Sequence, residues 1–205
     1  MTWKRTALAG AGALVVVVVS AGCSSGESNT SEHSSGHSTS ASASATGSLA
    51  SSAEAHNDAD VAFTQQMIPH HRQAVEMSDM LLAKQGIDPR VTALANQIKA
   101  EQGPEIRQMQ GWLDQWKLPP MPPMSGHEMT GMMSEQDMAA LTAARGADAS
   151  KLFLTQMISH HQGAITMAQK EIDTGQYPPA TQLARSILDT QQREIDTMNG
   201  MLGSM

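Results

Sequence analysis

The chain is poor in cysteine, in aromatic residues and in positive charge. Of its 205 residues one is cysteine and 3% are aromatic, and the formal net charge is −7. A single cysteine excludes an intramolecular disulfide and a zinc site built from several thiolates. With so few aromatic rings, the 16 methionines must supply part of the core as adaptable apolar side chains. The acidic balance disfavours nucleic acid as a partner, because binding to phosphate groups rewards a basic surface.

The N-terminal residues have the pattern of a bacterial secretory signal. Lys4 and Arg5 precede an apolar run over residues 7–19 that is short for a membrane span, and small residues then lead to Cys23. Residues 1–22 are therefore predicted to be a lipoprotein signal peptide. We expect a protein that is secreted across the cytoplasmic membrane and anchored at the cell envelope by a lipid on Cys23. An ordinary signal peptide followed by an incidental cysteine is the alternative.

Composition divides the rest of the chain. Residues 23–56 are mostly Ser, Ala, Gly and Thr and are expected to form a flexible tether, because they cannot bury enough apolar surface to offset the entropy of ordering. One domain is predicted over residues 57–205. It consists of a first helical hairpin over residues 57–117, a Met-rich linker over residues 118–134 and a second hairpin over residues 135–205.

Capping and helix-breaking residues predict the helices of this domain. They are expected over residues 58–85, 89–117, 134–145, 149–174 and 178–202. Pro104 lies inside the second of these and is expected to kink that helix rather than end it.

The first hairpin is repeated by the second. Phe63–Met77 recurs as Phe153–Met167, with the same Phe, Gln, Met, Ile, His, His, Ala and Met at one constant spacing. The second helix of each hairpin repeats as well, from Leu94 to Leu113 and from Leu183 to Leu202. Two hairpins that each carry one apolar face bury those faces against each other, which predicts an all-α four-helix bundle.

The repeated segment carries two His-His pairs. At about 100° per residue, His70 and His160 fall on the apolar stripe and point into the bundle, whereas His71 and His161 point toward its flank. These four are half of the chain's eight histidines. Histidine and methionine together are ligands for a soft metal such as copper, so the pairs are predicted to bind metal.

Methionines accompany both histidine pairs. Met67 and Met157 lie one helical turn before the histidines and are close enough to share an ion with them, while Met77 and Met167 lie further along the same stripe. The alternative is core packing of the methionines, with the histidines hydrogen-bonded to polar side chains of the second helices. Those side chains are Glu101, Gln102, Glu105, Gln191 and Glu194.

The linker is a second candidate copper site. It gathers Met121, Met124, His127, Met129, Met132 and Met133. Thioether sulfur favours Cu(I) and needs no deprotonation, which suits an oxidising compartment where thiols are lost. The alternative is an apolar loop packed on the bundle.

On these residues the chain resembles the bacterial domain-of-unknown-function family 305, which is grouped with the ferritin-like bundles. The matching residues are Phe63–Met77, Gly131–Ser134 and Phe153–Met167. The resemblance covers residues 57–203 and implies a ferritin-like four-helix bundle that is secreted or lipid-anchored. It also implies copper binding and copper tolerance, which are linked to some members, but no particular reaction.

The predicted function is that of a cell-envelope lipoprotein that binds copper, as Cu(I) through Met and His, and serves as a buffer, chaperone or tolerance factor. It is not expected to be an enzyme. A ferritin-like di-metal oxidase needs a glutamate three residues before a histidine on two helices, and Met67 and Met157 hold the places before His70 and His160. A metal-free envelope bundle that binds another protein remains an alternative.

Overall fold

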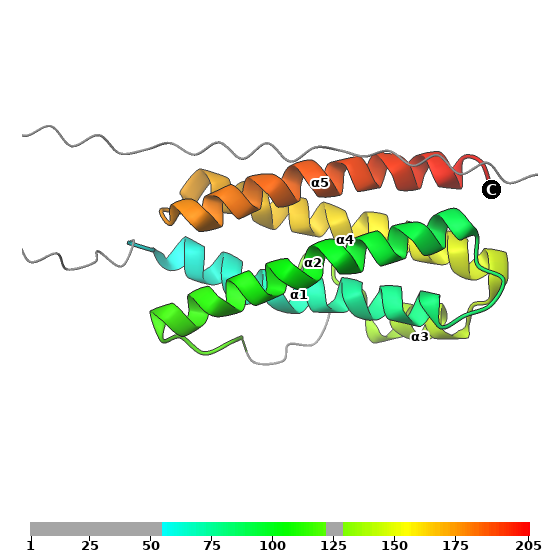
Figure 1. Cartoon of the computed structure of the whole chain (residues 1–205), viewed down its shortest axis with the longest axis horizontal. Coiled ribbons are helices and arrows are strands. Elements are labelled where there is room, and N and C mark those ends of the chain that lie inside the picture. The colour runs from blue at the N-terminus through cyan, green and yellow to red at the C-terminus, as the bar shows by residue number, and fades with distance from the viewer. Residues whose placement is uncertain (1–54, 122–128) are drawn as a thin grey trace, which may run out of the picture. The chain divides into compact units, whose positions relative to one another are not determined.

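The repeat in the sequence folds as two helical hairpins, shown in Figure 1 in a computed structural model. The structure describes residues 55–121 and 129–205. The predicted signal peptide and Cys23, almost all of the predicted tether, and the linker residues Met124 and His127 lie outside the described residues. Within them there are helices and no strand, which confirms the all-α prediction. The helices are α1 (Asp58–Leu82), α2 (Pro89–Trp116), α3 (Glu135–Ala143), α4 (Gly146–Thr174) and α5 (Pro178–Leu202).

The four long helices form the predicted bundle of two hairpins. Helix α1 packs along α2, α4 packs along α5, and α1 lies against α4 (Figure 1). The short helix α3 lies on α1 and α4, whereas α2 and α5 contact each other only sparsely. None of the helices in residues 55–121 and 129–205 is long and apolar enough to span a membrane.

The turn of each hairpin is hydrogen-bonded to the first helix of the other hairpin, which is α1 or α4. The buried carboxylate of Asp60 in α1 accepts the backbone N–H groups of Gln176 (3.1 Å) and Tyr177 (2.9 Å) in the turn before α5. The hydroxyl of Ser150, which takes the same place in α4, accepts the backbone N–H of Asp88 at 3.2 Å before α2. These contacts fix α1 and α4 antiparallel and in register.

The helix ends follow their capping residues, with two corrections to the predicted bounds. Helix α1 begins at a capping box on Asn57. It ends at Leu82, three residues before the expected place, and Gly86 lies in the following turn with a φ of +72°. Helix α4 begins at Gly146 rather than near Ala149, because the N–H of Ala149 already bonds to the carbonyl of Arg145. Helix α2 continues through Pro104, as predicted.

The core consists of two apolar clusters separated by a polar layer. One cluster is built around Met77, Ile98, Phe153, Met157 and Met198, and the other around Phe63, Met67, Met109, Ala164 and Ile187. On every long helix at least one buried polar residue comes between members of the two clusters. This polar layer consists of His70, His71, Gln102, His160, His161, Gln191 and Glu194.

Candidate metal centre

All four repeated histidines meet in the polar layer and are completely buried, with 0% exposure. The rings of His70 and His160 stack across the α1–α4 contact, with centroids 3.8 Å apart and an interplanar angle of 38°. Their inward direction agrees with the helical geometry. His71 and His161 point to the side of their own helix. The second helix of the same hairpin covers that side, so both rings are buried.

The second member of each pair is held by a glutamate. His71 Nε2 lies 2.7 Å from Glu105 Oε2 in α2, and His161 Nε2 lies 2.7 Å from Glu194 Oε2 in α5. A carboxylate only accepts hydrogen bonds, so each Nε2 carries a proton and donates it. In the neutral ring the lone pair is then on Nδ1. A carboxylate that orients a histidine in this way is the usual second contact of a metal-bound imidazole.

Six of the eight ring nitrogens in this layer have no hydrogen-bond partner among the described residues. They are Nδ1 and Nε2 of His70 and of His160, and Nδ1 of His71 and of His161. Buried polar atoms are almost always paired, and an unpaired one costs about 1–3 kcal/mol. The polar layer therefore contains six buried nitrogens that lack, within the described parts of the chain, the partner a buried polar atom normally has.

Burial also keeps the two stacked histidines neutral. It lowers the pKa of His70 to about 3, with smaller contributions from His71 and His161, while the nearby backbone of Thr130 opposes the shift. Burial, and then the neighbouring histidines, lower the pKa of His160 well below its usual value. At neutral pH both rings therefore hold free lone pairs, as a metal ligand requires.

Each side of the histidine layer carries a buried methionine pair. Met67 and Met109, from the two helices of the first hairpin, share one apolar cluster, and Met157 and Met198 from the second hairpin share the other. All four have 0% exposure. Met109 and Met198 were not among the predicted ligands. They occupy matching positions in the two copies of the repeat, and this match is a signal that could have identified them.

The end of the linker lies over the stacked histidines. Gly131, with a φ of +83°, crosses α4 at Gly163 so closely that a Cβ on Gly163 would lie 2.2 Å from the carbonyl oxygen of Thr130. The amide of Gln73 in α1 holds Met133 by two hydrogen bonds, one to its carbonyl (2.9 Å) and one from its N–H (2.7 Å).

The described linker methionines differ in burial. Met129 and Met133 are buried, and Met133 joins the apolar cluster of Phe153, so packing accounts for Met133. Met121 and Met132 are half-buried.

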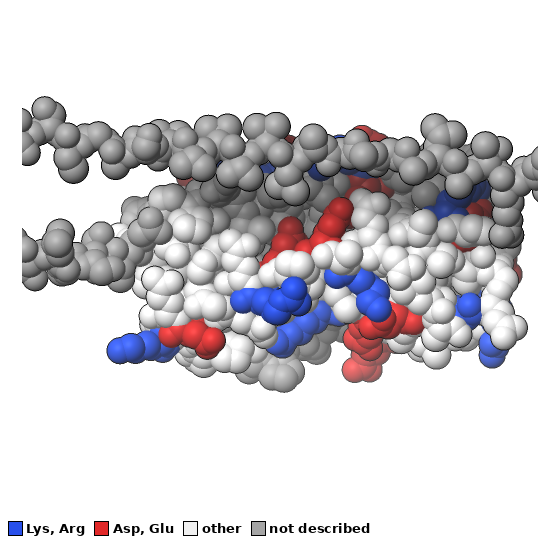
Figure 2. All heavy atoms as spheres, in the orientation of Figure 1, with Lys and Arg blue, Asp and Glu red and all other residues white. Residues whose placement is uncertain are grey.

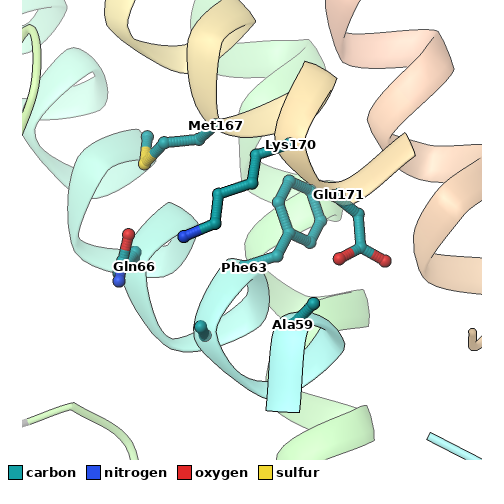
Figure 3. Close-up of a pocket in the computed structure, with 7 residues that line it drawn as sticks. Ala59, Phe63, Gln66, Met167, Lys170 and Glu171 are labelled. Carbon is teal, nitrogen blue, oxygen red and sulfur yellow. The ribbon is translucent and has the colours of Figure 1, made fainter. Parts of the chain in front are cut away.

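Met77 and Met167 have different surroundings despite the repeat. Met77 is fully buried in an apolar cluster. Met167 is half-buried beside a cavity of about 30 Å³ between α1 and α4, into which the ammonium of Lys170 also extends, near Gln66 (Figure 3). A neighbouring positive charge disfavours a metal cation at Met167.

The donor atoms fit a soft ion better than a hard one. In the part of the chain that the structure describes, no three His, Cys, Asp or Glu side chains lie close enough together to hold a metal ion. One ion in this layer can therefore have at most two of these imidazoles as ligands, and methionine sulfur from a neighbouring cluster would complete a donor set that favours Cu(I).

Comparison with known proteins agrees with this fold. The model of the family described as Domain of unknown function (DUF305) matches residues 60–202. A DUF305 fragment from Deinococcus radiodurans is 37% identical, with a TM-score of 0.68, and the match covers 73% of this chain and 98% of that one. A candidate secreted DUF305 protein from Streptomyces coelicolor is 32% identical, with a TM-score of 0.67, over 71% of this chain and 93% of that one.

A third solved structure is that of a metal-bound protein. CopM in its Cu(I)-bound form is 32% identical, with a TM-score of 0.61, and the match covers 71% of this chain and 96% of CopM. CopM has also been solved with Cu(II) and with Ag. Among the curated proteins none matches the chain.

Proposed function

The chain belongs to the DUF305 family, whose model matches residues 60–202, and we propose that it is a copper-binding protein of the bacterial cell envelope. In this proposal Cu(I) is held inside the bundle by the repeated histidines His70, His71, His160 and His161, no more than two of them on one ion, together with methionine. The role is that of a buffer, chaperone or tolerance factor, without catalysis.

The observation that carries the proposal is the set of six unpartnered ring nitrogens at the centre of the bundle. An apolar core would satisfy its packing better with leucine or phenylalanine at these places. Two buried imidazoles without partners among the described residues, beside two whose Nδ1 is unpartnered there, favour a ligand that accepts a nitrogen lone pair. A soft metal ion is such a ligand. The likeness to CopM, which binds Cu(I), Cu(II) and Ag, supports the same class of ion here.

Burial and hydrogen bonding favour metal binding by the histidines. The pKa of His70 is about 3, so the ring has no proton to release when it binds a cation at neutral pH. Glu105 and Glu194 keep His71 and His161 oriented, and thioether sulfur is never protonated in water.

The N-terminal sequence supports the proposed location at the cell envelope. The signal pattern of residues 1–22 and the small residues before Cys23 support export and attachment of a lipid to Cys23. Incorporation of labelled fatty acid into the parent but not into the Cys23→Ser variant tests this part of the proposal.

A competition titration with Cu(I) tests the binding. The domain over residues 55–205 is suitable, because the relative from Deinococcus radiodurans was solved as a fragment of which the match covers 98%. The parent is compared with a variant that replaces His70, His71, His160 and His161 by alanine, and with a Met121→Leu, Met124→Leu, Met132→Leu variant of the linker.

The two variants separate the candidate sites. We expect the parent and the linker variant to compete with the chelator and the histidine variant to fail while its helical circular dichroism persists. No competition by the parent would refute copper binding, and full binding by the histidine variant would move the site to the linker.

A further inference from the structure

The buried histidines have no exposed surface, so a metal ion must reach them through the bundle. Apolar clusters close the layer on both sides along the bundle axis. On the α1–α4 side, α3 and the loop over residues 129–133 cover it. The remaining side is the seam between α2 and α5, the pair of neighbouring long helices with the sparsest contact.

A small cavity of about 10 Å³ lies in this seam and is lined almost entirely by polar side chains. Its lining consists of Glu101, Gln102, Glu105, Ile187, Thr190, Gln191 and Glu194. A volume of this size admits about one water molecule or one ion. Figure 2 shows acidic atoms at the surface between α2 and α5 near the middle of the bundle.

Three carboxylates of the seam share one negative region. The amide of Gln97 bridges Glu101 (3.1 Å) and Glu194 (3.5 Å). Burial, and then the charges of Glu194 and Glu105, raise the pKa of Glu101. Of the ion pairs among the described residues, none joins these carboxylates to a lysine or arginine, and the nearby Arg193 donates to Thr190 instead.

Two buried amides face the same cavity. Gln102 and Gln191 are each 3% exposed. Within the part of the chain that the structure describes, both amide atoms of Gln102 and Oε1 of Gln191 have no hydrogen-bond partner. Amide and carboxylate oxygens together attract a cation and repel an anion. These unpartnered amides point to a ligand independently of the acidic charge.

We propose that the α2–α5 seam is a port through which a metal cation enters the bundle, with Glu101 at its mouth and Glu105 and Glu194 as the groups that pass the ion to His71 and His161. The proposal rests on the proposed function, because it needs the interior histidines to be the destination. Its ligand class is a partly hydrated metal cation of low charge.

The geometry gives each carboxylate a distinct part in the transfer. Glu101 is half-buried and meets the ion first, and its charge raises the local concentration of cations. Glu105 and Glu194 line the cavity and also touch the histidine layer, each at 2.7 Å. A soft ion that leaves these oxygens for imidazole and thioether gains affinity, so transfer is directed inward.

The rate of metal loading tests the port. Ag⁺ is the probe, mixed with the domain over residues 55–205 in a stopped-flow instrument at low ionic strength and followed by tryptophan fluorescence. The variants are Glu101→Gln and Glu101→Lys. The matched controls are Glu76→Gln and Glu76→Lys, which make the same charge changes on the exposed face of α1.

Loading is expected to slow about threefold in Glu101→Gln and about tenfold in Glu101→Lys, and release to a competing thiol is expected to slow as well. The equilibrium stoichiometry stays that of the parent, and the Glu76 variants load at close to the parent rate. The port is refuted if Glu101→Lys loads as fast as Glu76→Lys while the parent binds Ag⁺. If the parent binds no Ag⁺, the proposed function itself fails and the port falls with it.

Discussion

His70 and His160 stack with their ring centroids 3.8 Å apart at the centre of the bundle, and neither ring has a hydrogen-bond partner among the described residues. Each comes from the same place in one of the two repeated hairpins, so the contact lies where the two copies meet. Two neutral imidazoles that lie tilted against each other without hydrogen-bond partners in the described structure are costly for the folded protein. The cost is understandable if the rings exist to bind an ion.

Replacing both rings by leucine should stabilise the metal-free bundle and abolish its response to copper. His70→Leu with His160→Leu removes four unpaired buried nitrogens, and a gain of about 1–3 kcal/mol in unfolding free energy at pH 7 is expected. Thermal unfolding with and without Cu(I) measures both effects. A double variant that copper still stabilises would contradict the assignment of these two ligands.

The same variant should lose part of the parent's acid sensitivity. The pKa of His70 is about 3 in the folded protein and 6.5 in its ordinary state, so the unfolded chain binds the extra proton between these values. Parent stability is therefore complete above pH 6.5 and falls as the pH drops toward 3. Urea unfolding across this range should show a shallower fall in the leucine variant, whereas the exposed His56→Leu control should match the parent.

Glu105 should matter as a hydrogen-bond acceptor for His71. Glu105→Leu removes the acceptor and frees the ring to rotate, so the Cu(I) affinity is expected to fall about 10- to 100-fold. Glu105→Gln keeps an acceptor oxygen and should lose much less. Competition titrations of both variants decide this, and equal losses would show that the negative charge, rather than the orientation of the ring, is what counts.

Gly163 should be required by the loop over the histidines. Alanine favours a helix over glycine by about 1 kcal/mol, but its Cβ would lie 2.2 Å from the carbonyl oxygen of Thr130. Gly163→Ala is therefore expected to destabilise the domain by about 2 kcal/mol and to weaken copper binding as the loop is displaced. Gly111→Ala, with nothing within 4 Å of its Cβ, is the matched control and should be neutral or stabilising in chemical denaturation.

Glu171 should make the protein less stable in alkaline solution. Burial, and then the neighbouring carboxylate of Asp60, raise the pKa of Glu171 to about 8. The folded state thus keeps a proton that the unfolded state releases near its ordinary value of 4.5, and stability falls as the pH rises between these values. Glu171→Gln should flatten the stability profile from pH 5 to 8, and the exposed Asp173→Asn variant should not. Parallel profiles for the parent and Glu171→Gln would show that Glu171 is ionised throughout.

The repeat predicted most of the architecture because helical period and capping are local properties. The matching places of Phe63 and Phe153 implied two hairpins, and the period implied that His70 and His160 point inward. Asn57, Ser134 and Pro178 marked helix starts within a residue of where they occur. These features depend on residues within a turn or two of each other.

The partners across helices could not be predicted in the same way. That Glu105 and Glu194 bond to the flank histidines depends on how far each helix is rotated within its hairpin, which residue types alone do not specify. The approach of Gly131 to Gly163 depends on the path of a loop between distant elements. Nor does the repeat predict the surroundings of positions at which its two copies differ. Glu171, for example, is buried at the position that matches Leu81, although the residue type has changed from apolar to acidic.

The X-ray absorption spectrum of the copper-loaded domain distinguishes the buried histidines from the linker methionines as the copper ligands. One equivalent of Cu(I) is bound to the domain over residues 55–205, and the scatterers around copper are identified from the extended fine structure. We expect imidazole nitrogen and thioether sulfur in the same coordination sphere, with the nitrogen signal lost from the variant that replaces His70, His71, His160 and His161 by alanine. A sphere of sulfur alone that is unchanged in that variant would place copper on the linker methionines and contradict a site at the buried histidines.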